Sequence, residues 1–131
     1  MVLIDTSIWI ASTHKSSPAN VTRSMRDLLR RDAALAHDFV HGELLLGKGG
    51  RTRQEIVELY ARLKRLHVVS HDAALAFAKK HKLDNRGLGW VDVHLLAAAY
   101  ENKAKVWTND KEMKTAATEL EIAYAPTEEV I

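Results

Sequence analysis

The stretch that decides the fold is VLIDTS, residues 2–7 of the chain. Its first three side chains, from Val2 to Ile4, are large and apolar, which predicts a short buried strand. The strand ends on the carboxylate of Asp5. Burying a charged group is costly unless it is hydrogen-bonded, ion-paired or bound to a cation. Asp5 therefore either caps the next helix, pairs with a basic side chain or helps to hold a cation.

Short strands and helices alternate along the rest of the chain. Helical patterns lie between the strands, including an apolar stripe at positions 21, 25, 28 and 29 and another at 56, 59, 60 and 63. This alternation predicts an α/β fold with a parallel sheet that helices cover on both faces. The five predicted strands are Val2–Ile4, Ala33–Ala36, His67–Val69, Lys105–Trp107 and Ile122–Tyr124.

Three sequence signals predict where helices begin. Ser17 followed by Pro18 is typical of an N-cap and a first helical residue, and Thr52 with Glu55 fits a capping box. Ser70 precedes the alanine-rich stretch HDAALAFAKKH and is a third candidate N-cap.

Composition favours one globular domain over residues 1–131. Hydrophobic residues make up 47% of the chain and charged residues 27%, and the formal net charge is +2. The absence of cysteine excludes disulfides and thiolate chemistry. The longest apolar stretch, LLAAAY, is too short to cross a bilayer, and the start of the chain lacks the pattern of a signal peptide. We therefore expect a cytoplasmic protein with no membrane partner.

Four acidic residues are candidates for a common site. Asp5 ends the first strand and Asp110 closely follows the strand KVW, so both belong at the carboxyl edge of the sheet, where α/β proteins bind ligands. Glu43 shares a helix face with Phe39 and Val40, and Asp92 shares one with Leu95, Leu96 and Ala99. We therefore expect Glu43 and Asp92 to point inward.

Each acid taken alone has an ordinary structural explanation. Asp5 is a good N-cap for the helix that begins TSIWIA, Asp92 in a first turn suits the helix dipole, and Asp110 suits a helix start. Glu43 lies in mid-helix and would need a buried Lys or Arg partner. Together, however, four acids at one end of a sheet repel one another unless a cation lies among them. Oxygen ligands without cysteine or a matched histidine set favour Mg²⁺ or Mn²⁺.

The motifs VLIDTSIWI, GELLLG and WVDVHLLAAAYENKAKVWTND resemble the PIN-domain nucleases, specifically the small VapC-type toxins of toxin–antitoxin pairs. The resemblance runs nearly end to end. It implies an α/β/α sandwich around a central parallel sheet and a Mg²⁺- or Mn²⁺-dependent endoribonuclease. It also implies inhibition by a small antitoxin protein, whose C-terminal segment occupies a groove of the toxin, and a homodimer.

Carried over residue by residue, the resemblance implies a catalytic quartet. Asp5 and Asp92 are the best direct metal ligands, and Asp110 and Glu43 act directly or through water, to activate a water that attacks the phosphodiester. Thr108 matches the hydroxyl residue beside the last acid. Met113 and Trp90 depart from the usual family pattern.

Two further groups are candidates for substrate binding. Thr6 and Ser7 follow the first acid. The segment GKGGRTR contains Lys48, Arg51 and Arg53 and could cradle an RNA backbone, although an ordinary solvated turn explains it as well. It lacks the spacing of a P-loop.

Other functions remain open from the sequence. A PIN-fold nuclease outside toxin–antitoxin biology would show the same motifs, and a silent RNA- or protein-binding module would keep the fold. The complete acidic quartet argues against a silent module. A response-regulator receiver needs an adjacent acidic pair after the first strand, whereas IDTS contains one acid.

Overall fold

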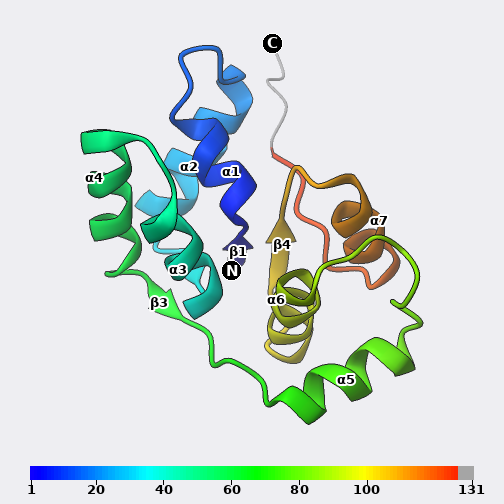
Figure 1. Cartoon of the computed structure of the whole chain (residues 1–131). Helices are drawn as coiled ribbons and strands as arrows, with labels where there is room; N and C mark the ends of the chain where they lie inside the picture. The colour runs from blue at the N-terminus through cyan, green and yellow to red at the C-terminus, as the bar shows by residue number, and fades with distance from the viewer. Residues whose placement is uncertain (127–131) are drawn as a thin grey trace.

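A computed structural model describes residues 1–126 of the chain. Its sheet has four strands in the order β3-β2-β1-β4, and all neighbouring pairs are parallel. β1 (Val2–Ile4) lies between β2 (Ala34–Ala36) and β4 (Lys105–Trp107), and β3 (Lys64–Arg65) forms an edge. The chain moves from β1 outward to β3 and then returns to the other side of β1 (Figure 1). The reversal of strand order therefore lies between β1 and β4, which is where sheets of this kind bind ligands.

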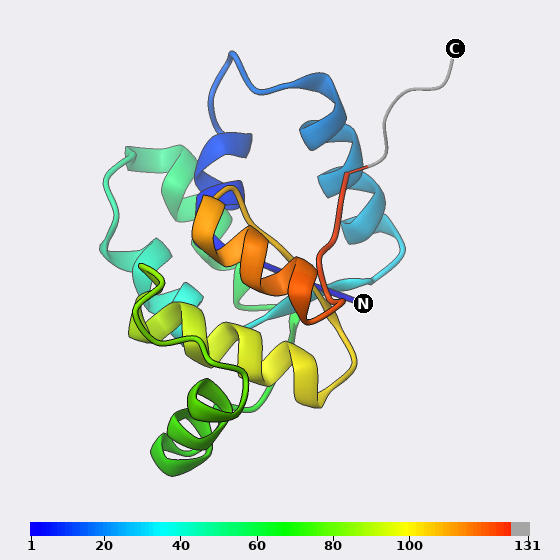
Figure 2. The ribbon, with the colours of Figure 1, turned by 90° about the vertical axis from the view of Figure 1, so that its right-hand side faces the viewer.

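Helices cover both faces of the sheet, as the alternation predicts. Right-handed crossovers place the helices before β3 on one face and the later helices on the other, and Figures 1 and 2 show these three layers. The first group contains α1 (Thr6–Ser12), α2 (Ala19–Arg30), α3 (Asp38–Leu46) and α4 (Gly50–Tyr60), and the second contains α5 (His71–Lys80), α6 (Trp90–Glu101) and α7 (Lys111–Glu119).

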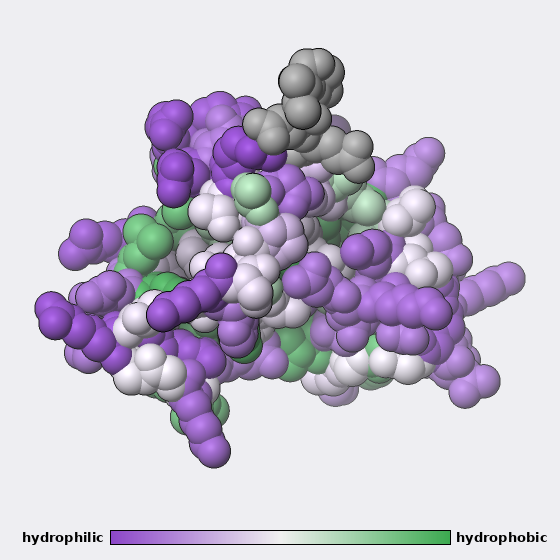
Figure 3. Space-filling view, turned by 90° about the horizontal axis from the view of Figure 1, so that it is seen from above, coloured by the Kyte–Doolittle hydropathy of each residue, from purple (hydrophilic) through white to green (hydrophobic). Residues whose placement is uncertain are grey.

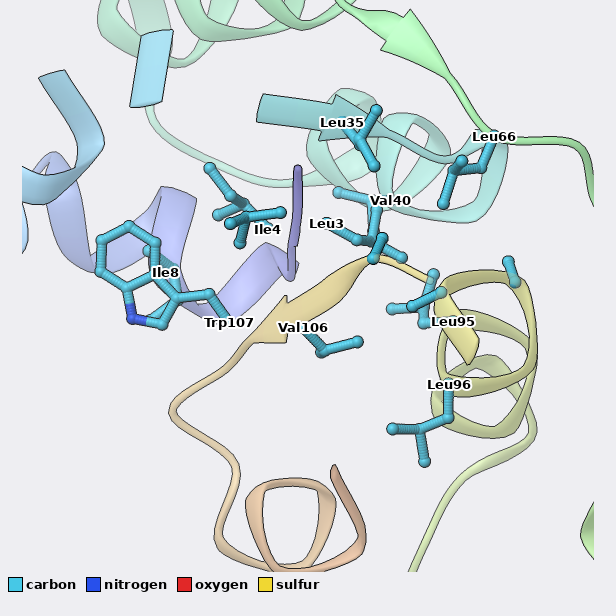
Figure 4. Close-up of a cluster of buried hydrophobic side chains, with 14 of the residues drawn as sticks. Leu3, Ile4, Ile8, Leu35, Val40, Leu66, Leu95, Leu96, Val106 and Trp107 are labelled. Carbon is cyan, nitrogen blue, oxygen red and sulfur yellow. The ribbon is translucent and has the colours of Figure 1, made fainter. Parts of the chain in front are cut away.

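The core joins β1 to the helices on both sides. Leu3 and Ile4 of β1 are completely buried, and Figure 4 shows them near Leu95 of α6 and Trp107 of β4. Residues 93–99 of α6 are all buried, because the small side chains of positions 97–99 allow the helix to lie close against the sheet. This packing fixes the first turn of α6 at the carboxyl edge.

Two of the five predicted strands differ from the structure. The prediction of a strand at His67–Val69 is wrong, because β3 is Lys64–Arg65 and its pairing ends where the Leu66 amide donates to the Ala36 carbonyl at 2.9 Å. Leu66 is buried and Val68 is exposed, so Leu66 provides the apolar anchor. The segment Ile122–Tyr124 forms only a parallel bridge between Ala123 and Val106, on the free side of β4.

One of the three predicted helix starts is confirmed. Ser70 caps α5, and its hydroxyl accepts a 3.1 Å hydrogen bond from the Ala73 amide. Pro18 rather than Ser17 is the N-cap residue of α2. The capping box at Thr52 is wrong, since α4 already begins at Gly50 after the left-handed backbone of Gly49.

No helix within residues 1–126 is both long and apolar enough to span a membrane.

Candidate active site

Asp5 stands at the carboxyl end of the central strand with its carboxylate nearly buried, the residue being 8% exposed. It is the N-cap of α1, and one carboxylate oxygen accepts a 2.7 Å hydrogen bond from the Thr6 amide. The other oxygen accepts from the hydroxyls of Ser7 at 2.9 Å and Thr108 at 2.8 Å. The capping explanation for Asp5 is therefore correct, and it explains only one of the two carboxylate oxygens.

The segment after β4 is tied to the start of α1 by hydroxyl groups. Thr108 is buried, and its hydroxyl accepts a 3.0 Å hydrogen bond from the Asp110 amide while it donates to Asp5. The Ser7 hydroxyl accepts from the Asn109 amide at 3.0 Å. The Asp110 carboxylate caps α7 by accepting from the Met113 amide at 2.8 Å. Asp5 and Asp110 thus lie on neighbouring strand ends joined through Thr108.

Asp92 lies in the first turn of α6. Its carboxylate accepts a 2.9 Å hydrogen bond from the Gly89 amide, which closes the turn. Burial raises the pKa of Asp92, the Gly89 hydrogen bond opposes this shift, and the carboxylates of Asp5, Asp110 and Glu43 raise the pKa further. Three acids from distant parts of the sequence therefore lie near enough to Asp92 to act on it electrostatically.

Glu43 differs from its predicted environment. The expectation that it points inward is wrong, because its side chain is exposed. Within residues 1–126 it forms no ion pair with a basic side chain. Instead, one carboxylate oxygen accepts a 2.7 Å hydrogen bond from the Thr6 hydroxyl. Glu43 therefore lies at the open rim of the site, on the α3 side, and its hydrogen bond joins it to Thr6, the residue directly after Asp5.

The donor set suits a hard cation. Within residues 1–126, none of the four carboxylates forms an ion pair with Lys or Arg, so their charges are uncompensated. In the same region, no three Asp, Glu or His side chains converge closely enough to form a ready-made metal cage. Mg²⁺ usually keeps several waters and binds through one or two carboxylates, so an open ring of oxygens fits it.

The edge where these residues meet is visible in the ribbon. Figure 2 shows the first turns of α6 (lime) and α7 (orange) on the same side of the molecule as α1 and α3. Two helix N-termini with acidic residues thus face the carboxyl end of β1, because every strand in the sheet points the same way.

The three basic side chains that follow α3 make different contacts. The Arg53 guanidinium donates to the Leu44 carbonyl at 3.1 Å and packs so closely on Gly47 that a Cβ there would collide with it. Arg51 forms an exposed ion pair with Glu55, with an N···O distance of 3.4 Å, and Lys48 is exposed. Arg53 therefore holds the loop, while the other two side chains face solvent.

Two histidines near the site are buried. His37 caps α3 by accepting a 3.0 Å hydrogen bond from the Phe39 amide, and burial lowers its pKa to about 4. Burial also lowers the pKa of His94. Within the described residues, His37 Nε2 and His94 Nδ1 have no hydrogen-bond partner. Phe39 separates the two rings, with centroid distances of 5.0 Å and 4.9 Å.

Sequence reasoning missed several contributors to the site. It did not assign the Gly89 and Asn109 amides, which hold Asp92 and Ser7, because backbone donors leave no mark in the residue type. Trp90 departs from the family pattern, and in the structure it is the first residue of α6 with its side chain partly exposed.

Comparisons with known proteins agree with this geometry. The family model of the PIN domain matches residues 2–119. Ribonuclease VapC32 of Mycobacterium tuberculosis, from strains CDC 1551 and H37Rv, is 38% identical over 126 residues, which cover 95% of this chain and 97% of the relative.

Solved structures share the fold at low identity. FitAB bound to the IR36 DNA fragment aligns with a TM-score of 0.64 at 19% identity and covers 94% of this chain and 92% of its own. VapBC2 from Rickettsia felis, bound to a DNA fragment from its promoter, aligns with a TM-score of 0.64 at 16% identity and covers 88% and 92%. The chain therefore belongs to the PIN-domain family, as a VapC-type member.

Proposed function

We propose that the protein is a metal-dependent endoribonuclease, the toxin of a type II toxin–antitoxin pair, which hydrolyses RNA phosphodiester bonds in the cytoplasm. The observation that carries this proposal is that Thr108 joins Asp5 to Asp110 at the carboxyl edge of the sheet, near Asp92 and Glu43, with no basic side chain paired to any of the four acids within residues 1–126. Similarity to Ribonuclease VapC32 over 95% of the chain supports RNA as the substrate.

The four acids would hold Mg²⁺ or Mn²⁺. Asp5 and Asp92 are the proposed direct ligands, and Asp110 and Glu43 bind directly or through water. A cation held there would lower the pKa of a water so that it loses a proton and attacks phosphorus as hydroxide, and it would offset charge on the phosphate oxygens. No side-chain nucleophile is needed.

The hydroxyl residues have positioning roles in this proposal. Ser7 and Thr108 donate to the same oxygen of Asp5, which fixes the orientation of the carboxylate. Thr6 holds Glu43 at the rim. These hydrogen bonds favour orientation of the acids over direct contact of Thr6 and Ser7 with RNA, because each hydroxyl hydrogen is already donated.

Lys48 and Arg51 are the proposed contacts to the RNA backbone beyond the acids. Both are exposed in the α3–α4 region, and Figure 2 shows the loop between these helices on the same side as the start of α6. Arg53 would support this loop through the Leu44 carbonyl. Replacing both Lys48 and Arg51 with Gln should weaken RNA binding and flatten its salt dependence.

An antitoxin is the proposed protein partner. An apolar groove of about 320 Å³ runs between α1, α2 and α4 and includes Trp9, Met25, Ile56 and Leu59. Figure 3 shows apolar (green) side chains among hydrophilic ones on the left of the upper surface, where α4 lies in Figure 1. Arg26 also lines the groove, which favours an amphipathic segment with acidic residues at its edge. The homodimer implied by the family is likewise proposed, and light scattering tests it.

The deciding experiment compares Asp92→Asn with the unchanged protein on RNA, with Mg²⁺ or Mn²⁺ and with EDTA. Asparagine retains an oxygen that can accept from the Gly89 amide, so the fold should survive while cleavage is lost. Asp72→Asn is the matched control, because Asp72 lies in the first turn of α5 and is exposed. Full cleavage by Asp92→Asn, or cleavage that persists in EDTA, would refute the proposed site.

A further inference from the structure

Trp90 is the one tryptophan of the three whose ring is presented at the surface. Trp9 and Trp107 are each 2% exposed, whereas Trp90 is 41% exposed. It is the first residue of α6 and lies two positions before Asp92. Its indole N–H has no hydrogen-bond partner within residues 1–126, whereas that of Trp9 donates to the Ile4 carbonyl. A large aromatic ring with a free donor thus lies in the same first turn of α6 as Asp92.

Contacts on two sides hold this ring in place. The ring of His94, one turn further along α6, meets it edge to face at a centroid distance of 4.9 Å. The ring of His71, the first residue of α5, lies 5.2 Å away. His94 itself is buried and rests on Phe39 of α3. A ring fixed in this way loses little conformational entropy when a ligand packs on its open part.

The preceding loop is also anchored. The Arg86 guanidinium forms an ion pair with Glu119 of α7, at an N···O distance of 2.6 Å. Gly89 is held by the carboxylate of Asp92. The position of Trp90 relative to the acids is therefore set before any substrate arrives.

We propose that Trp90 stacks on an unpaired base of single-stranded RNA, at a nucleotide that flanks the scissile phosphate. This inference rests on the proposed nuclease function. Aromatic rings bind exposed base faces regardless of sequence, and bases inside a duplex do not offer these faces. Single-stranded RNA is therefore the substrate class that this site fits.

The geometry of α6 indicates on which side of the acids the flanking nucleotide lies. Residues two apart on an α-helix point in nearly opposite directions, so Trp90 faces away from Asp92. Its ring contacts reach His71 of α5, whereas Asp110 lies at the start of α7. Figure 2 shows α5 and α7 on opposite sides of α6. The RNA would thus run from the acids toward the start of α5.

Tyr100 provides a matched control. It lies near the other end of α6, is 42% exposed, and contacts the aromatic rings of Phe77 and His81. The two residues therefore share the helix, the exposure and the aromatic surroundings, and only Trp90 lies near the acids.

The test measures the affinity for a single-stranded RNA of about ten nucleotides and for the same sequence in a duplex. Affinity is measured with labelled RNA and Mg²⁺ on proteins that also carry Asp92→Asn, so that the RNA is not cleaved. Metal-dependent cleavage is measured on proteins that keep Asp92. Trp90→Ala should weaken single-stranded binding by about 5- to 150-fold and leave duplex binding unchanged. Trp90→Phe should restore most of the affinity, and Tyr100→Ala should match the parent protein. An equal loss with Tyr100→Ala, or an equal loss for the duplex, would overturn the inference.

Tryptophan fluorescence gives a second readout that does not depend on cleavage. Because the other two tryptophans are buried, RNA should quench the emission of Trp90, and Trp90→Phe should abolish this change. Absence of quenching on binding overturns the stacking inference. If the protein without substitutions fails to cleave any RNA with metal, the nuclease proposal fails, and the quenching experiment still decides whether Trp90 meets a base.

Discussion

The hydroxyl of Thr108 donates a 2.8 Å hydrogen bond to the carboxylate of Asp5 across 103 positions of sequence. The same hydroxyl accepts from the amide of Asp110 at 3.0 Å. One buried side chain therefore connects the ends of β1 and β4, at the point where the strand order reverses. The acids of the two strands are held in relation to each other by this hydroxyl group.

Replacing Thr108 with Val should impair both stability and cleavage. Valine fills the same space but leaves the Asp110 amide without its acceptor and Asp5 with one donor fewer. We expect the free energy of unfolding to fall by about 1–3 kcal/mol and cleavage to fall by about 10- to 100-fold. Urea denaturation and RNA cleavage measure the two effects. Thr108→Ser keeps the hydroxyl and is the control, and normal activity in Thr108→Val would contradict the positioning role.

Two substitutions of Asp110 should separate its capping role from its charge. Asn is as good an N-cap as Asp, so Asp110→Asn should leave stability nearly unchanged and lower cleavage by at least about ten-fold. Asp110→Ala also removes the acceptor of the Met113 amide, which should cost about 1 kcal/mol of stability. Thermal unfolding and cleavage assays distinguish the two variants. If Asp110→Asn cleaves normally, Asp110 only caps α7.

Stability should fall as the solution is acidified through the range set by His37. Burial lowers the pKa of His37 from 6.5 to about 4, so between these values the unfolded chain binds more protons. The contribution of the neutral His37 to the free energy of unfolding is fully present above about pH 6.5 and is lost as the pH falls toward 4. Its maximum is about 3 kcal/mol. The charged or titratable groups that act on this histidine are Asp38, which raises its pKa, and His94 and Arg65, which lower it.

Urea denaturation near pH 7 and near pH 5 tests this linkage. His37→Asn retains a capping oxygen for the Phe39 amide and should show a smaller loss of stability on acidification than the parent. His14→Asn changes an exposed histidine and should keep the parental pH dependence. Equal pH dependence in all three proteins would mean that other groups control acid stability.

A charge in the apolar groove should block the protein partner and spare the chemistry. Leu59 lines the groove between α1, α2 and α4 and is 39% exposed, so Leu59→Asp should fold and cleave RNA normally. Co-expression with the proposed antitoxin should then no longer suppress cleavage. Leu75→Asp, at an equally exposed leucine of α5, should remain suppressed. Continued suppression of Leu59→Asp would place the partner elsewhere.

The predictions that succeeded and failed have distinct physical origins. β1, β4 and the cap at Ser70 were predictable because each depends on a few adjacent residues. The sequence predicts an edge strand at His67–Val69 because those residues favour strands, whereas tertiary packing buries Leu66 and pairs Lys64–Arg65 with β2. Propensity is weakest at a sheet edge, where burial of a neighbouring residue decides the register.

Glu43 illustrates the same limit at the site. Its spacing relative to Phe39 and Val40 indicated a buried face, yet the buried face of α3 runs through Val40 and Leu44 and leaves Glu43 exposed. Its partner, Thr6, lies 37 positions away. No local pattern could have identified that pair.

The sequence by itself determined the α/β class, the parallel sheet and the identity of four acids, because strand and helix periodicity and residue type are local properties. Only the tertiary structure decided which hydroxyls orient the acids, that Glu43 lies at an open rim, and that Trp90 is held between His71 and His94. These contacts join residues from different elements. Their geometry depends on how β1, β4 and α6 pack against one another, which no single segment encodes.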